Sequence, residues 1–470
     1  GAGRVSRYTP LPGFTVQAYR FAVDPTPRQR RALVSHCGAA RFAYNWAVSW
    51  VRAGWDQRAA EVSYGVPEAE LTQWRGWSLP VLRKVWNQVK GDLAPWWSEN
   101  SKEAYNTGLA NAAAAFDNYK ASRDGARAGA RMGRPRRKRK HATVLSCRFT
   151  TGTIRVEADR HHVTLPRLGA IRTHESTRKL ARRIEAGTAR VLSATVSHRA
   201  GRWFVALQAE IRRDDPAPAR PGVVIGVDLG ISHLAVLSRP VSGVTDEHGF
   251  VANPRHLDTA QRALRRANRR VSRRRGPDRR TSQRPSNRWH KANRARNHVH
   301  HRVTNLRTDG LHKLTTALTR HAGTLVVEDL NVTGMLANRR MARHIADAGW
   351  GTLRRQLDYK TAWRGGTLHV ADRWFASSKT CSDCGAVKTK LPLRVRVFTC
   401  NTCGLVCDRD LNAARNLATL ATLATELSES GTGVAGHPQP PGWNGRGADR
   451  KTRPGLAGGR ETSTPQRLGA

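Results

Sequence analysis

Four cysteines near the C-terminal end constrain the folding of this chain more than any other feature of its sequence. Cys381, Cys384, Cys400 and Cys403 form the pattern C-x₂-C-x₁₅-C-x₂-C, and a glycine follows each pair. Two tight loops that each present two thiolates are typical of a zinc ribbon, and four thiolates leave no open position on the metal. We therefore expect one structural Zn²⁺ here and an ordinary, small, buried side chain at Cys407.

The charge of the chain is strongly unbalanced. Its 81 Lys and Arg residues against 35 Asp and Glu residues give a net charge of +46. Such an excess repels itself and disfavours the compact state unless a polyanion neutralises it. We therefore expect nucleic acid as a standing partner.

Length and hydropathy set further limits. The 470 residues predict two to four domains. The sequence has no run of 18 apolar residues, and residues 1–10 lack the apolar core of a signal peptide. We expect no membrane partner and a bacterial, cytoplasmic and nucleoid-associated protein.

The N-terminal half predicts helices inserted into a β-structure. Residues 14–24 alternate as a strand does, and Thr26 followed by Pro27 is a helix start. Between residues 142 and 212 short strand-like runs predict a small barrel or sandwich, which the first strand could join. Helices are expected over residues 27–50, 68–76, 79–94 and 98–121, followed by a Gly/Arg-rich loop at 123–141.

The C-terminal half contains a strongly basic segment. Residues 255–307 hold 18 Lys and Arg, too many and with too few acids for a merely solvated surface. The spacing of Arg262, Arg266, Arg269 and Arg273 places them on one helical face, so we predict a nucleic-acid-binding helical hairpin broken near 276–277. Further predictions are strands at 324–330 and 366–371, helices at 346–364 and 410–427, and a disordered tail at 428–470.

Carboxylates lie at the ends of apolar segments. Asp228 lies within PGVVIGVDLGISHLAVL, Glu328 ends an apolar strand, and Asp408 and Asp410 begin a helix. A buried carboxylate needs a cation, and three acids suit a site with two Mg²⁺ ions that hydrolyses a phosphodiester. Each acid alone is more often a turn or capping residue. The spacing leaves open whether Asp408 or Asp410 is the third ligand.

Three motifs together resemble a known family. GVDLGISHLAVL, VVEDLNVTGM and CSDCG…FTCNTCGLVCDRDLNAARNL are similar to the three RuvC segments and the zinc ribbon of TnpB, a transposon-encoded RNA-guided nuclease. GRPRRKRKH resembles the basic turn of that family, which adds Arg136, Arg137 and Lys138 as nucleic-acid contacts. The resemblance covers roughly residues 14–425 and implies that the catalytic acids are Asp228, Glu328 and Asp410.

The resemblance also implies a mixed α/β architecture with several parts. These are an N-terminal wedge β-barrel, an inserted helical recognition domain, and an RNase H-like RuvC nuclease with an embedded zinc ribbon. The implied boundaries are 1–25 for the first barrel strand, 26–125 for the recognition domain, 126–220 for the barrel, 221–375 for RuvC segments I and II with a basic insertion at 255–320, 376–406 for the ribbon, and 407–427 for segment III.

The implied activity is Mg²⁺-dependent cutting of target DNA beside a short motif, directed by a guide RNA from the transposon end. A compact type V CRISPR effector would have the same chemistry and stays an alternative. A guided DNA-binding protein without cleavage is a third possibility, which the presence of all three acids disfavours. A direct transposase is a weaker fourth one.

Overall fold

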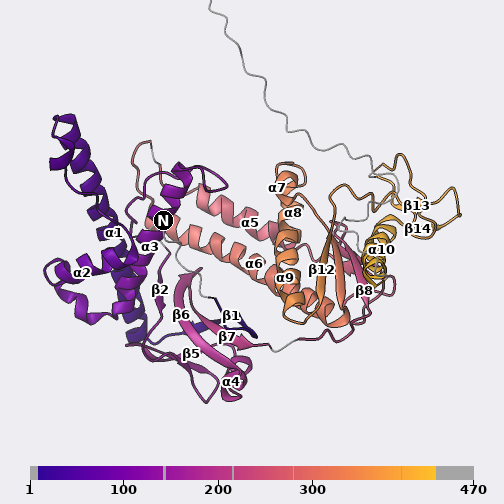
Figure 1. The fold of residues 1–470 in the computed structure, drawn as a ribbon, viewed down its shortest axis with the longest axis horizontal. Helices are drawn as coiled ribbons and strands as arrows, with labels where there is room; N and C mark the ends of the chain where they lie inside the picture. The colour runs from indigo at the N-terminus through magenta and orange to yellow at the C-terminus, as the bar shows by residue number, and fades with distance from the viewer. Residues whose placement is uncertain (1–8, 141–143, 214–215, 279, 393, 430–470) are drawn as a thin grey trace, which may run out of the picture.

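The chain folds into three groups of secondary structure (Figure 1). The computed structural model describes residues 9–429 except 141–143, 214–215, 279 and 393. The first strand is followed by a helical group and then by the other strands of a seven-stranded sheet. A five-stranded sheet flanked by helices comes next, and a small cysteine-rich lobe is attached to it. The architecture is therefore mixed α/β, as expected.

The helical group lies between the first and second strands of the seven-stranded sheet. Thr26 begins it with a capping box, in which its side chain and that of Gln29 each accept a hydrogen bond from the other residue's backbone amide. The elements are α1 (Pro27–Ser63), η1 (Glu68–Glu70), α2 (Leu79–Leu93), η2 (Pro95–Glu99) and α3 (Lys102–Arg123).

The predicted helix at 68–76 is wrong, because only Glu68–Glu70 form a short 3₁₀ turn. The backbone beyond that turn is satisfied by side chains of α1 instead. Glu61 accepts hydrogen bonds from the amide and hydroxyl of Thr72, and Arg58 donates to the Thr72 carbonyl. These bonds hold the segment extended along α1.

The seven-stranded sheet is antiparallel, in the order β2-β6-β7-β1-β5-β4-β3. The first strand pairs with both β7 and β5, which confirms that the helices are inserted into the β-structure. In the described residues β2 and β3 are the two edges and do not pair, so a closed barrel is not formed. The strands are β1 (Phe14–Asp24), β2 (Ser146–Phe149), β3 (Arg155–Val156), β4 (His162–Leu165), β5 (Gly169–Thr173), β6 (Ala189–Arg199) and β7 (Arg202–Arg212).

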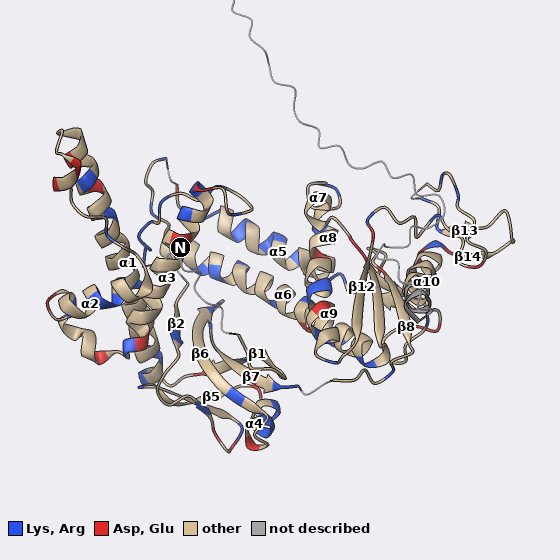
Figure 2. Cartoon of the chain, in the orientation of Figure 1, with Lys and Arg blue, Asp and Glu red and all other residues tan. Residues whose placement is uncertain are grey.

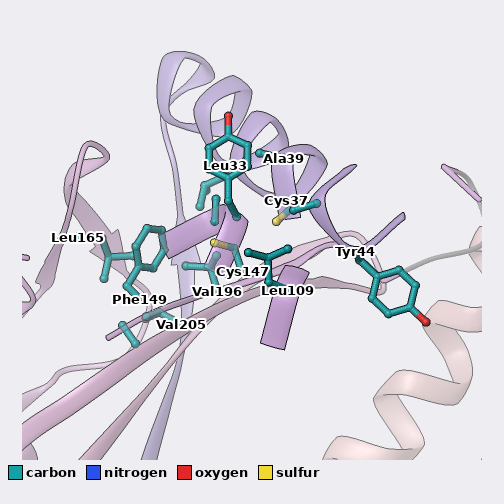
Figure 3. Packing of buried hydrophobic residues seen from close by; sticks show 14 of the residues in the cluster. Leu33, Cys37, Ala39, Tyr44, Leu109, Cys147, Phe149, Leu165, Val196 and Val205 are labelled. Carbon is teal, nitrogen blue, oxygen red and sulfur yellow. The ribbon is translucent and has the colours of Figure 1, made fainter. Parts of the chain in front are cut away.

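A helix lies between β5 and β6 in the sequence, where strands alone were expected. Helix α4 (Arg178–Glu185) buries only Leu180 and Ala181, and its other side chains are mainly basic. So short an apolar face gives little periodic signal. The sheet and the helical group share one core, in which Cys37 and Leu109 of the helices lie among Cys147, Phe149 and Val196 of the strands (Figure 3).

The five-stranded sheet has the order β10-β9-β8-β11-β12. Strands β8, β11 and β12 are parallel neighbours, whereas β9 and β10 are antiparallel to theirs. Helix α10 (Arg409–Glu429) packs on one face, and α9 (Trp350–Ala362) with the end of α6 packs on the other (Figure 1). The strands are β8 (Val224–Asp228), β9 (His233–Leu237), β10 (Phe250–Ala252), β11 (Thr324–Glu328) and β12 (Thr367–Ala371).

The predicted basic hairpin is present as α5 (His256–Ser272) and α6 (Asn287–His321), with the break where Gly276 and Pro277 stand. Two short helices, α7 (Val332–Met335) and α8 (Ala342–Ala348), precede α9, and β13 (Val397–Thr399) pairs with β14 (Val406–Asp408) in the cysteine-rich lobe. Among the described helices, none is long and apolar enough to span a membrane. Of the expected disordered tail, residues 428 and 429 end α10, and 430–470 lie outside the described residues.

Candidate nuclease and metal sites

Two of the predicted acids stand at the same edge of the five-stranded sheet. Asp228 is the last residue of β8 and Glu328 the last residue of β11. The two strands are parallel neighbours in a register that pairs Val227 with Val327, so their C-terminal ends lie side by side. Asp410, in the first turn of α10, is close enough for its charge to act on Asp228. All three side chains are partly exposed, as a ligand-binding site requires.

The electrostatics of this site favour a bound cation. Burial raises the pKa of Asp228 well above its ordinary value, and the charges of Glu328 and Asp410 raise it further, with only partial opposition from Arg409. The pKa of Asp410 is also raised, by burial and by Asp408. Carboxylates that raise one another's pKa in this way are stabilised in their charged form by divalent ions.

The spacing of the acids suits more than one ion. Among the described residues, only the cysteine group brings three or more ligand atoms all within 4.8 Å of one another, so the three carboxylates stand farther apart. Two Mg²⁺ ions about 4 Å apart, with ligand bonds of about 2 Å, connect oxygens up to about 8 Å apart. Acids that do not form one tight group of ligand atoms are better suited to two ions than to one.

The neighbouring acids have other partners. Asp408 Oδ1 accepts hydrogen bonds from the amides of Asp410 (2.8 Å) and Leu411 (3.1 Å), so Asp408 caps α10. Asp329 forms ion pairs with Arg354 (2.8 Å) and Arg373 (2.7 Å). Asp410 lies 3.7 Å from Arg396 in an ion pair, and the charges of both Asp408 and Asp410 act on Asp228, so the choice of Asp410 as the third ligand stays a prediction.

The cysteine cluster brings the four predicted thiols together. All four Sγ atoms lie within 4.8 Å of one another, and the Cys381–Cys403 and Cys384–Cys400 sulfur pairs are each 3.6 Å apart. Amides of Cys403 and Thr402 lower the pKa of Cys400 to about 6, which makes it a thiolate at neutral pH. Thiolates are the form that binds zinc, so the cluster is compatible with a structural zinc ion.

Each pair of cysteines sits on a tight loop. The amides of Gly385 and Gly404 donate to the carbonyls of Cys381 (3.0 Å) and Cys400 (3.2 Å), and both glycines have a φ near +75°. Only glycine adopts this left-handed conformation without strain. Cys407 lies outside the cluster and is partly buried against it rather than fully buried.

The cysteine-rich lobe is attached to the carboxylate site by side chains that the sequence analysis missed. Ser377 Oγ donates to Glu328 Oε1 at 2.5 Å. The side-chain amides of Asn412 and Asn416 in α10 donate to the Thr380 carbonyl (2.6 and 2.7 Å), and that of Asn416 also donates to the Ser377 carbonyl (2.7 Å). The i, i+4 spacing of the two asparagines was the available signal, since it places them on one helical face.

A cationic groove lies between α5 and α6, two helices that carry many Lys and Arg residues (Figure 2). It has a volume of about 1030 Å³ and includes Arg266, Arg269 and Arg273 of the predicted set, whereas Arg262 is exposed outside it. Leu264, Ala267 and Val271 form the buried face of α5. The cations that line the groove are Arg266, Arg269, Arg270, Arg273, Arg274, Arg288 and Lys291.

The basic turn divides into exposed and packed residues. Arg136 and Arg137 are exposed. Lys138 is half-buried with its ammonium 3.8 Å from the Tyr44 ring centre, and its backbone exchanges two hydrogen bonds with the Asn45 side chain. Lys138 therefore contributes to packing inside the protein, which a run of consecutive basic residues does not indicate.

A second basic cavity, of about 1370 Å³, lies where the seven-stranded sheet meets α6 and α9. Among the described residues, no Asp or Glu lines it. Buried Lys360 donates to the His312 carbonyl and to the hydroxyls of Thr315 and Thr316, all uncharged acceptors. Its lining cations are Lys179, Arg182, Arg183, Arg213, Arg320, Lys360 and Arg364. They come from four separate segments, so no local sequence pattern could reveal the cavity.

Comparisons with known proteins identify relatives of this chain. Family models match residues 206–339 ("Probable transposase"), 350–417 ("Cas12f1-like, TNB domain") and 15–58 ("Helix-turn-helix domain"), although residues 27–63 form one continuous helix here. A "Putative RNA-guided DNA endonuclease" of Mycobacterium tuberculosis is 40% identical over 463 residues, which cover 96% of this chain and 94% of that protein.

Two further similarities are more distant. A protein of the same printed name from Streptomyces pristinaespiralis is 36% identical and covers 90% of this chain and 92% of its own length. A structure titled "Cryo-EM structure of the Cas12f1-sgRNA-target DNA complex" is 12% identical, with a TM-score of 0.46, and the match covers 86% of this chain and 99% of that one.

Proposed function

The chain belongs to the family of TnpB-like RNA-guided DNA endonucleases, and from that premise we propose that it hydrolyses DNA phosphodiesters at the edge of its five-stranded sheet. The observation that carries this proposal is the position of Asp228 and Glu328 at the ends of neighbouring parallel strands, with the charge of Asp410 acting on Asp228. The mixed five-stranded sheet that presents them supports the RNase H-like, RuvC-type assignment.

The proposed metal ligands are Asp228, Glu328 and Asp410. Two bound Mg²⁺ ions would supply an activated water and stabilise the leaving oxygen. The hydrogen bond from Ser377 fixes one oxygen of Glu328 and leaves the other for the site. Asp408 holds the first turn of α10, and thus Asp410, through its capping bonds. Each ligand is therefore positioned by its own element before any ion binds, as effective metal catalysis requires.

We further propose a guide RNA from the transposon end and a target DNA as partners. The groove between α5 and α6 and the second basic cavity, here called the junction cavity, together present fourteen cations, and no carboxylate of the described residues lines either of them. Phosphates of an RNA–DNA duplex would supply the missing negative charge. We assign the seven-stranded sheet to the wedge domain, 26–125 to the recognition domain and 376–406 to a zinc ribbon that holds one structural Zn²⁺.

The test is cleavage by the protein with its co-purified RNA. Asp228→Ala, Glu328→Gln and Asp410→Asn should each reduce cutting of a matched DNA to background while RNA binding stays intact. Asp309→Asn is the matched control, because that acid is exposed on α6 and paired only with Lys313. EDTA should stop cutting, and Mg²⁺ should restore it.

Three results would overturn the proposal. Wild-type cutting by Asp228→Ala would place the chemistry elsewhere. Cutting that needs the acids but ignores the RNA sequence would indicate an unguided nuclease, while guided binding with no cutting under any metal would indicate a guided binding protein.

A further inference from the structure

Trp374 is an exposed indole beside the proposed nuclease site. Its side chain is 82% exposed, whereas the next residue, Phe375, packs inward near Leu417 and Ala421. Tryptophan is enriched at binding surfaces, because its ring offers a large apolar face together with a polar N–H. We propose, resting on the nuclease function above, that Trp374 stacks on a base of the single-stranded DNA that enters the site.

The strand register places Trp374 near the catalytic carboxylates. Ala371, at the end of β12, is paired with Glu328 at the end of β11. Paired strands lie about 5 Å apart, and three further residues extend at most about 11 Å. The Trp374 backbone is therefore within about 16 Å of Glu328, a span of a few stacked nucleotides at about 3.4 Å each.

The surface between the two residues is hollow. A depression of about 480 Å³ is lined by Trp374, Asp329 and Arg373, and a second one of about 380 Å³ is lined by Glu328 and Leu229. Both depressions include Arg354 and Val370, so they adjoin each other. A strand lying in them would contact the indole at one end and Glu328 at the other.

The loop that carries Trp374 is fixed on both sides. The Trp374 amide donates to Asp372 Oδ1 (2.8 Å), and Arg373 pairs with Asp329 (2.7 Å), the residue after Glu328. Three residues later, Ser377 bonds to Glu328 itself. A stacking surface held in place in this way loses little conformational entropy on binding.

The charges at this rim explain why stacking would be the main attraction. The acids Asp329 and Asp372 are balanced by Arg354 and Arg373, and both arginines are paired with Asp329. The rim therefore has no excess positive charge with which to hold a backbone. Stacking on an aromatic ring needs no such charge and accepts every base, which suits a nuclease whose specificity lies in base pairing.

The experiment compares Trp374→Ala and Trp374→Phe in the RNA-bound protein. Removing a base-stacking ring should lower the second-order rate constant for cutting by about 5- to 150-fold. Trp374→Phe keeps a ring and should retain most of the rate. Leu11→Ala is the control, because this apolar side chain is also largely exposed (58%) but lies outside the helical group and outside both depressions. RNA binding, zinc content and melting temperature should be equal in all three variants.

A binding measurement separates this inference from the nuclease assignment. DNA with 2-aminopurine at successive positions, bound in the Asp228→Ala background, should be quenched at one position, and Trp374→Ala should remove that quenching. Unchanged cutting and quenching in Trp374→Ala would overturn the stacking proposal while leaving the nuclease function intact. A loss in Trp374→Phe as large as in Trp374→Ala would also overturn it. Wild-type cutting by Asp228→Ala would instead overturn the nuclease assignment.

Discussion

Gly226 of β8 lies directly against Ala414 of α10, and a methyl group at Gly226 would stand 2.0 Å from the Ala414 carbonyl oxygen. Residues two apart in a strand share a face, as do residues four apart in a helix. The contact between Gly226 and Ala414 therefore also brings Asp228, two residues on, toward Asp410, four residues before. The glycine determines how closely the third acid approaches the first.

We expect Gly226→Ala to move α10 away from the sheet. The methyl group meets backbone atoms that cannot rotate aside, so the protein should lose about 1–3 kcal/mol of stability. Gly91→Ala is the control, because this exposed helical glycine has nothing within 4 Å of the added carbon and should gain about 0.5–1 kcal/mol. Denaturant unfolding measures both effects.

Cutting should fall in Gly226→Ala even at temperatures where the variant stays folded, because Asp410 shifts relative to Asp228. A displacement of about 1 Å at a catalytic group can cost about a hundredfold in rate. A destabilised variant that cuts at the wild-type rate would show that the approach of α10 is a matter of packing alone.

Removing one cysteine should affect both the cysteine-rich lobe and the carboxylate site. Cys400→Ser should abolish zinc binding and lower the melting temperature, since four thiolates fold a lobe that has only a small core of its own. Cutting should also fall, because Ser377, which lies just before the cysteines in the chain, donates a hydrogen bond to Glu328. Unfolding of the cysteine-rich lobe would disturb that bond and with it the position of Glu328. Elemental analysis and thermal melting measure the effect, with Cys407→Ser, outside the cluster, as a control that keeps its zinc.

Local patterns in the sequence predicted much of this fold. The strand at 14–24 and the helix start at Thr26 agree with β1 and the capping box, and the cysteine spacing predicted a cluster that forms. These features depend on neighbouring residues or on a ligand with fixed geometry. The helix expected at 68–76 failed because side chains of α1, distant in sequence, satisfy its backbone.

The site shows the same division. The sequence indicated that Asp228 and Glu328 end apolar strands. It did not indicate that they are adjacent, because this depends on the parallel pairing of two strands about a hundred residues apart. The assignment of Asp410 rests on resemblance, and the capping role of Asp408 supports it. Ser377, Trp374 and the junction cavity depend on tertiary contacts, and the sequence analysis missed all of them.

Charge reversal in the groove between α5 and α6 should weaken nucleic-acid binding. Arg266→Glu with Arg269→Glu removes two cations from its lining and should reduce the slope of log affinity against log salt by about 1.4–1.8. Filter binding at several salt concentrations measures this slope. Replacing both arginines by Lys should keep the slope. Arg262 is exposed on the same helix but outside the groove, so Arg262→Glu should change the slope less than the double charge reversal does. An equal slope in the double variant would remove the groove from the interface.

Lys360 should take up protons when RNA binds. Burial, followed by the charge of Arg364, lowers its pKa from about 10.5 to about 8. In the RNA-free protein the folded state therefore binds fewer protons than the unfolded state between about pH 8 and 10.5. This group consequently makes stability rise as pH increases through that window.

A phosphate in the junction cavity would favour the charged ammonium and raise this pKa again. At pH 8 about half of the Lys360 side chains are neutral, so binding should take up as much as about half a proton per chain. Calorimetry of RNA binding in two buffers with different ionisation enthalpies measures this uptake. Lys360→Met should remove it, whereas Lys313→Met, an exposed lysine on α6 and outside the cavity lining, should not. Equal uptake by wild type and Lys360→Met would show that the RNA does not reach the cavity.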